Sequence, residues 1–277
     1  MRLKKPIDKP LEAEAEAFAL RQPVLQAQAA SATGKVRRHN EDALFAMSTQ
    51  VFLQGQQQTV GLYMIADGMG GHVDGERASS LAVQTAAQAI LQSSLQPAGL
   101  MQPPTTPEEA EALLDQAMQA AQIEVLAQVP GGGSTLTVAL VVGRQLYFAH
   151  VGDTRLYFCP QGGQVRVLTK DHSVARRLVD LGQLNAAEAQ VTPLRNRLFR
   201  ALGQGEGFTA DFGWQALEEP ARLLLCSDGL WGTLPEKALF EALQESPLPA
   251  DATWKLVGGA NAAGGSDNIS VILVDIL

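Results

Sequence analysis

The feature that most constrains this chain is an apolar, strand-like run that ends in aspartate, which recurs along its length. Such runs are YMIAD at Asp67, AHVGD at Asp153 and LLCSD at Asp228, and the reverse order, GGSD before an apolar run, occurs at Asp267. A fifth acid, Asp42, precedes the apolar segment ALFAM. A single Asp-Gly pair is most often a turn. Five acids in this setting instead suggest that carboxylates gather at one edge of a β-structure.

The apolar runs are short and rich in β-branched and aromatic residues, which predicts strands. Strands are expected at 61–67, 135–143, 145–152, 154–160, 164–169, 222–228 and 268–276. Helical periodicity predicts long helices at 76–95 and 107–128, joined by a Pro-rich loop at 96–107, and shorter helices at 172–181, 235–244 and 251–262. Thr106, Pro107 and Glu109 form a helix-start signal with a capping box. Helices that cluster between hairpin-like strands favour a layered α+β fold over a regular βαβ repeat.

The chain of 277 residues is long enough for one large domain or two small ones, and its composition is ordinary for a globular fold. Residues 1–27, rich in Ala and Glu, are expected to be an N-terminal extension, either helical or mobile, before a domain at 28–277. The formal net charge of -8 argues against a nucleic-acid partner. No apolar run approaches the roughly 20 residues that cross a bilayer, and the N-terminus lacks a secretory pattern. We therefore expect no membrane partner, a cytoplasmic location, and buried, reduced thiols at Cys159 and Cys226.

Several catalytic chemistries lack their required residues. Neither cysteine has an arginine six residues later, so a thiolate phosphatase is not indicated. The glycine-rich segment 131–138 has no lysine for a nucleotide-binding P-loop, and no GxSxG serine-hydrolase motif is present. The four histidines do not follow Gly-Asp pairs, as a histidine-rich dinuclear centre would require. What remains is chemistry on metals that carboxylates hold.

The aspartates themselves favour hard cations. Carboxylates at the ends of buried strands repel one another unless something compensates their charge, and Arg155 is the only basic residue directly beside them. Oxygen ligands without His or Cys select Mg²⁺ or Mn²⁺ over Zn²⁺. Arg37, five residues before Asp42, could add a planar fork for phosphate oxygens, or it could be one surface charge beside Lys35 and Arg38.

Six ordered segments carry a family resemblance. They are VRRHNED (36–42), IADGMGGH (65–72), AHVGDTRLY (149–157), LTKDHS (168–173), LLLCSDGLW (223–231) and GGSDNISVILVDI (264–276). In this order they resemble the motifs of the protein phosphatase 2C, or PPM, family, in its bacterial form. The similarity runs from about residue 28 to the C-terminus.

The resemblance implies a four-layer α-β-β-α sandwich with two central antiparallel β-sheets, and a site at one edge that holds two Mn²⁺ or Mg²⁺ ions and a third, weaker one. Asp67 would bridge two ions, with the Gly68 carbonyl as a further ligand. Asp228 and Asp267 would be ligands of the second ion, and Asp153 of the third. Asp42 would hold metal-bound water, and Arg37 would clamp phosphate.

The implied activity is hydrolysis of phosphoserine and phosphothreonine in proteins, with metal-activated water attacking phosphorus directly. Substrates would be targets of a Ser/Thr kinase, and the enzyme would be a monomer. Met69 stands where eukaryotic relatives have a candidate acid, so the acid stays open and His72 is one option. Thr192-Pro193 stands where relatives often have His-Pro in the flap, 174–203. Alternatives are a catalytically weak binding or regulatory module, or a specialised target such as an anti-sigma antagonist or a secretion-system component.

Overall fold

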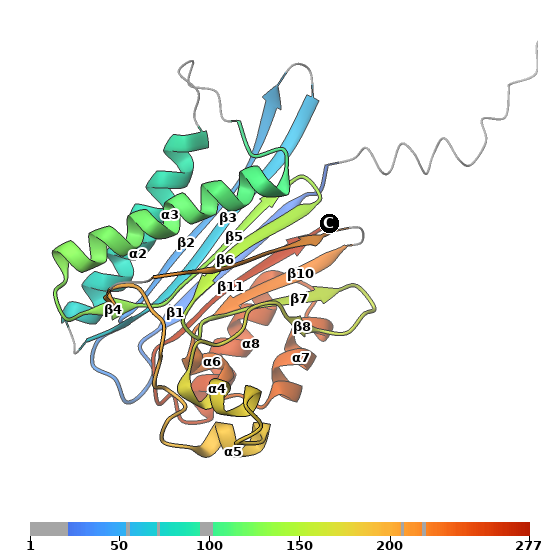
Figure 1. The fold of residues 1–277 in the computed structure, drawn as a ribbon. Coiled ribbons are helices and arrows are strands. Elements are labelled where there is room, and N and C mark those ends of the chain that lie inside the picture. Colours follow the sequence, from blue (N-terminus) through green and yellow to red (C-terminus); the bar gives the residue numbers. More distant parts are fainter. Residues whose placement is uncertain (1–21, 54–55, 71–72, 95–101, 206–207, 218–219) are drawn as a thin grey trace, which may run out of the picture.

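Two antiparallel β-sheets form the centre of the computed structural model, which describes residues 22–53, 56–70, 73–94, 102–205, 208–217 and 220–277 (Figure 1). One sheet has the strand order β1 (Leu25–Ala32), β11 (Ile269–Ile276), β10 (Ala221–Cys226), β7 (Arg155–Pro160) and β8 (Arg166–Val167). The other has the order β2 (Asp42–Leu53), β3 (Gln56–Met69), β5 (Leu136–Val142), β6 (Gln145–Val151) and β9 (Asp211–Ala216), with β4 (Gly133–Ser134) paired to β3. Their facing sides share an apolar core of residues such as Tyr63, Leu156 and Ile272.

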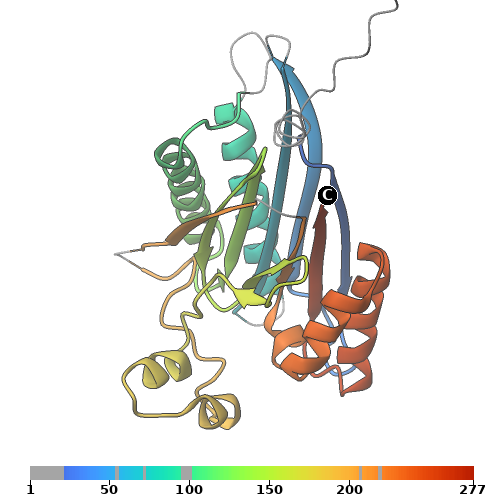
Figure 2. The same cartoon turned by 90° about the vertical axis from the view of Figure 1, so that its right-hand side faces the viewer.

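Helices cover the outer faces of both sheets. Helices α2 (Val73–Ser94) and α3 (Pro107–Gln128) pack on the sheet that contains β3, through a core that includes Met64, Leu114 and Met118. Helices α6 (Asp228–Trp231), α7 (Glu236–Glu245) and α8 (Pro249–Ala262) pack on the other sheet. Figure 2 shows the two sheets between these helical layers. The predicted four-layer sandwich is confirmed.

The helix predictions hold with shifted ends. The short helix expected at 172–181 is α4 (Val174–Asp180), which Ser173 caps, and a further helix, α5 (Ala186–Val191), follows it. At the start of α3 the capping box is only half right. Thr106 Oγ1 accepts the Glu109 N–H at 3.2 Å, but the Glu109 carboxylate accepts from the backbone and hydroxyl of Thr105, one residue earlier than expected.

Three strand predictions need correction. Strand β3 continues past Asp67 to Met69, because β4 pairs with Gly68 and Met69 there. The run at 164–169 forms only two strand residues, Arg166–Val167. Strand β9, with Asp and Gly in DFGWQA, had no predicted counterpart. Strand β1 starts at Leu25, within the segment assigned to the extension, and residues 1–21 of that segment lie outside the described residues.

Candidate active site

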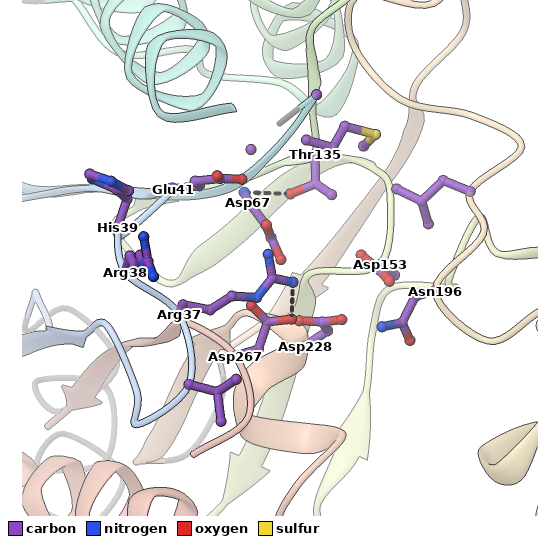
Figure 3. A pocket seen from close by; sticks show the side chains of 15 residues that line it. Arg37, Arg38, His39, Glu41, Asp67, Thr135, Asp153, Asn196, Asp228 and Asp267 are labelled. Carbon is purple, nitrogen blue, oxygen red and sulfur yellow. Dashed lines mark hydrogen bonds and ion pairs between the residues drawn. The ribbon is translucent and has the colours of Figure 1, made fainter. Parts of the chain in front are cut away.

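A pocket of about 460 Å³ opens at one end of the sandwich (Figure 3). Six of the seven predicted site residues line it: Arg37, Asp67, Gly68, Asp153, Asp228 and Asp267. The seventh, Asp42, does not. Thr135, Asn196 and Leu198 also line the pocket, and none of the three was singled out from the sequence. The distant acids therefore meet in one place.

The register of the strands explains this convergence. Asp42, at the start of β2, is the cross-strand partner of Asp67 near the end of β3. Asp153 follows the end of β6, whose partner strand β5 begins at the same edge. Asp228 follows β10 and Asp267 precedes β11, and these strands are antiparallel neighbours. Because antiparallel strands alternate in direction, an end and the next start lie at one edge of the sheet.

Asp67 is held in place by its backbone. Its N–H donates to Thr135 Oγ1 at 2.8 Å, and its carbonyl accepts the Thr135 N–H at 2.9 Å. Gly68 follows in a crowded position: a Cβ there would lie 2.0 Å from the carbonyl oxygen of Gly75 in α2. Only glycine lets α2 approach the strand this closely. This contact is a structural reason for Gly68 that does not depend on the proposed metal ligand.

The carboxylates raise one another's proton affinity. Burial, and then the charges of Asp42 and Asp228, raise the pKa of Asp67 well above its usual range. Burial, and then Asp228, does the same to the pKa of Asp153. Burial and the charge of Asp267 raise the pKa of Asp228 to about 6, although Arg195 and a hydrogen bond with Asp67 partly offset the increase. The nearby arginines therefore offset only part of the negative charge of the cluster.

Asp42 lies behind the pocket wall. Its Oδ2 accepts a hydrogen bond from Ser227 Oγ at 2.9 Å, and its Oδ1 is shielded from solvent with no hydrogen-bond partner. Burial raises the pKa of Asp42 to about 7 in spite of hydrogen bonds from Ser270 and Ser227. The residue therefore acts on the cluster through its neighbours Asp67 and Asp228, and in this structure its carboxylate does not reach the cavity.

Arg37 lies inside the pocket lining. Its Nη2 donates to Asp267 Oδ2 at 2.8 Å, and about half of the side chain is exposed (Figure 3). This position fits a phosphate-binding residue of the pocket better than a surface charge. The pairing with Asp267 occupies one edge of the guanidinium, and Nη1 and Nε remain for an anion.

The loop that carries Asp153 is fixed by a stacked arginine. The Trp231 indole N–H donates to the Asp153 carbonyl at 3.0 Å, and the Arg155 guanidinium lies 3.6 Å from the Trp231 ring centroid. Arg155 itself forms two hydrogen bonds to Asp171, at 2.9 and 2.7 Å. The basic residue beside Asp153 in the sequence thus serves mainly Asp171. The LTKDHS motif contains this partner.

The flap is tied to the same loop through His172. The backbone N–H of His172 donates to the Gly152 carbonyl at 2.7 Å, and the backbone N–H of Gly152 donates to Nδ1 of the His172 ring at 3.1 Å. His172 Nε2 then lies 3.0 Å from Asp211, which also pairs with Arg200 at 2.6 Å. The backbone of Phe199 donates to the His172 carbonyl. These contacts hold Asn196 and Leu198 against the pocket.

The donor set fits hard divalent cations. The pocket is lined by five carboxylate residues, Glu41 among them, and by one histidine, His39, and the buried Oδ1 atom of Asp228 has no hydrogen-bond partner. Among the residues that the structure describes, no group of three or more His, Cys, Asp or Glu side chains is already arranged around one point as a metal cage. The negative charge of the pocket is instead partly offset by the hydrogen bond between Asp67 and Asp228 and by the ion pair of Arg37 with Asp267.

Comparison with known proteins agrees with this site. The model of the family "Protein phosphatase 2C" matches residues 35–253. The serine/threonine phosphatase stp of Listeria innocua serovar 6a is 33% identical over 248 residues, which cover 87% of this chain and 92% of the relative. The crystal structure of the Mycobacterium tuberculosis serine/threonine phosphatase PstP/Ppp is similar with a TM-score of 0.75 at 33% identity, covering 91% of this chain and 98% of that one.

The chain belongs to the protein phosphatase 2C family, and the predicted class of enzyme, a protein serine/threonine phosphatase, is confirmed. A further similar structure, with a TM-score of 0.75 at 31% identity over 92% of this chain and 99% of that one, is the catalytic domain of PstP in complex with two manganese ions. The chain spans 45% of the full-length Mycobacterium tuberculosis PstP. His72, the candidate acid, lies outside the described residues.

Proposed function

We propose that this protein hydrolyses phosphoserine and phosphothreonine in other proteins with two Mn²⁺ or Mg²⁺ ions, and with a third ion bound more weakly. The observation that carries the proposal is the convergence of Asp67, Asp153, Asp228 and Asp267 in one pocket beside Arg37. Similar proteins named as serine/threonine phosphatases support it, as does the relative that binds two manganese ions.

The family resemblance suggests which pocket residues would hold the ions. Asp67 and the Gly68 carbonyl would be ligands of the ions. Asp228 and Asp267 would hold the second ion, and Asp153 the third. When bound, the ions would activate a water molecule and neutralise charge on the transferring phosphoryl group.

The protein's own residues would position the phosphate. Water attacks phosphorus in line with the departing serine or threonine oxygen, and no phosphoenzyme forms. The free edge of the Arg37 fork binds the equatorial phosphoryl oxygens, where charge is spread in the transition state. Asp42, from behind the wall, orients the active-site water through its neighbours. Thr135 fixes the backbone of Asp67, and Trp231 fixes that of Asp153.

We also infer the biological setting. Substrates are phosphoproteins produced by a Ser/Thr kinase, and the enzyme works as a cytoplasmic monomer in bacterial signalling. Within the described part of the chain, no helix has the length and apolar character of a membrane span. A binding module without turnover is the alternative, and the complete set of pocket carboxylates together with Arg37 favours the enzyme.

Phosphate release from a phosphothreonine peptide and from a small aryl phosphate tests the proposal. We expect turnover with Mn²⁺ or Mg²⁺, loss of turnover on exhaustive chelation, and recovery on adding the ion back. The variant Asp228→Asn should lose nearly all turnover, whereas Asp251→Asn, on the exposed start of α8, should keep it. Turnover that survives chelation would exclude the metal mechanism, and near-normal turnover of Asp228→Asn would exclude the assigned ligands.

A further inference from the structure

The flap, residues 174–203, differs in charge from the rest of the protein. It contains five arginines and two acids and so has a net charge of +3, although the whole chain has a net charge of -8. The remainder of the chain therefore has a net charge of -11. A basic segment next to the pocket of an acidic protein indicates an anionic partner for this segment.

The two acids of the flap are already engaged. Asp180 pairs with Lys170 at 2.7 Å and with Arg176 at 3.2 Å. The Glu188 carboxylate accepts the Asn185 N–H at 2.8 Å and so caps α5. Neither acid is available to neutralise the remaining arginines of the flap.

The arginines divide into engaged and unengaged groups. Arg200 pairs with Asp211, and the Arg177 guanidinium lies 5.6 Å from the ring centroid of Phe199. Arg195 donates only to neutral oxygens, those of Gln190 and Asn196. Arg197 is exposed, and with the residues that the structure describes it forms no ion pair.

Arg197 and Arg38 belong to segments on two sides of the pocket. Asn196 and Leu198 line the pocket, and Arg197 is the exposed residue between them in the chain. Arg38 belongs to the lining on the other side, and it forms no ion pair with the residues that the structure describes. In Figure 3, Arg38 and Asn196 lie on opposite sides of the Asp67 and Asp228 carboxylates.

We propose that Arg38 and Arg197 recognise anionic side chains on both sides of the phosphorylated residue, so that the preferred substrates are phosphosites within acidic sequence. The inference rests on the proposed function, because it assumes that the phosphate group itself enters the pocket. A bound peptide would pass between Arg38 and Arg197, and each planar guanidinium would bind a carboxylate or a second phosphate of the peptide. Exposed pairs of this kind change rates by a few-fold each, and salt weakens them.

The test compares phosphothreonine peptides that share one core. One has Glu at the three positions on either side, one has Gln there, and one has Gln with a second phosphothreonine three residues away. The readout is the ratio of kcat/KM to that of the Gln peptide, at low and at high salt. We expect a preference of about tenfold for the Glu peptide at low salt, falling as salt rises. The doubly phosphorylated peptide shows whether phosphate is preferred to carboxylate.

Charge-reversal variants test whether Arg38 and Arg197 cause the preference for the Glu peptide. Arg197→Glu and Arg38→Glu should each reduce the ratio by about threefold, and the double variant should abolish it. Lys237→Glu, with the same charge change on a cation that is 86% exposed on α7, should leave the ratio as in the wild type. If a reversal prevents folding, Arg197→Gln and Arg38→Gln provide the same comparison with a smaller expected loss.

The outcomes separate this inference from the proposed function. Hydrolysis of the aryl phosphate with an equal rate on Glu and Gln peptides would overturn the inference alone. Absence of hydrolysis of every substrate would overturn the proposed function. Peptide binding measured by fluorescence anisotropy would then still test the roles of Arg38 and Arg197. If these arginines bind the residues on either side of the phosphothreonine, the Glu peptide must bind more tightly than the Gln peptide. Equal loss in the Lys237→Glu control would mean that net charge, and not these two residues, sets the preference.

Discussion

Asp228→Asn should stabilise the protein while it destroys the site. The pKa of the Asp228 carboxyl is raised from 3.8 to about 6, mainly by burial and by the charge of Asp267. Two units correspond to about 3 kcal/mol that ionisation of this group costs the native state, at roughly 1.36 kcal/mol per unit. Asparagine removes the charge at nearly constant volume. Without divalent ions at pH 8, we therefore expect a gain of about 2–3 kcal/mol, or roughly 5–10 °C in Tm.

The pH dependence of this gain identifies its cause. The folded-state pKa is raised, so the native state binds the proton more tightly than the unfolded chain does. Below pH 4 both states are protonated, and the wild type and the variant should be equally stable. The difference should grow as pH rises from 4 to 6 and stay constant above that.

Thermal unfolding followed by circular dichroism, in chelator and from pH 4 to 8, measures the effect. The surface variant Asp251→Asn is the control and should change stability by less than about 0.5 kcal/mol. In excess Mn²⁺ the order should reverse, because ions that bind only the folded wild type stabilise it. A gain that is absent at pH 8, or equally large at pH 4, would refute the argument that repulsion in the acid cluster destabilises the fold.

Three further substitutions test separate parts of the site. Arg37→Ala should raise KM for an aryl phosphate about tenfold, with a smaller effect on kcat, in steady-state kinetics. If KM and kcat are both unchanged, Arg37 is a surface charge and does not bind phosphate. Trp231→Phe keeps the stacking ring but removes the N–H bond to the Asp153 carbonyl, so kcat should fall several-fold while Tm changes little; a large fall in Tm with normal kcat would argue for a purely structural role. Gly229→Ala places a Cβ 2.0 Å from a backbone carbonyl oxygen and should lower the free energy of unfolding, measured by chemical denaturation, by more than about 2 kcal/mol. The control Gly258→Ala, in α8, meets nothing within 4 Å and should stabilise the protein slightly. Equal effects of the two substitutions would contradict the packing argument.

The position of each acid at the end of a strand could be predicted from local patterns, whereas their convergence in one pocket was an expectation from the family resemblance. Each aspartate adjoins an apolar run, and the strand character of these runs is strong. In an antiparallel sheet, the end of one strand and the start of its neighbour lie at one edge. Asp67, Asp153, Asp228 and Asp267 therefore came together as expected, even though the strand order could not be derived.

The supporting contacts could not be predicted, because they join residues that are distant in the chain and chemically ordinary. The Trp231 side chain binds a backbone carbonyl 78 residues away, and the Thr135 hydroxyl binds one backbone N–H. Neither residue differs in the sequence from a typical core tryptophan or loop threonine. Strand β9 lacks a period-two pattern and forms because β6 offers it an edge. The position of Asp42 behind the wall likewise depends on the pairing of β2 with β3 and on Ser227.

The pairing of Arg37 with Asp267 connects substrate binding to the charge state of the pocket. The 2.8 Å contact of Arg37 with Asp267 neutralises one carboxylate of the cluster. The same guanidinium edge cannot bind both Asp267 and a phosphate. A cation that engages Asp267 would release Nη2, so the full fork would become available to phosphate only when the carboxylates are already compensated. The acid cluster and Arg37 thus form one electrostatic unit, because the guanidinium that would bind phosphate pairs with one of the carboxylates that would hold cations.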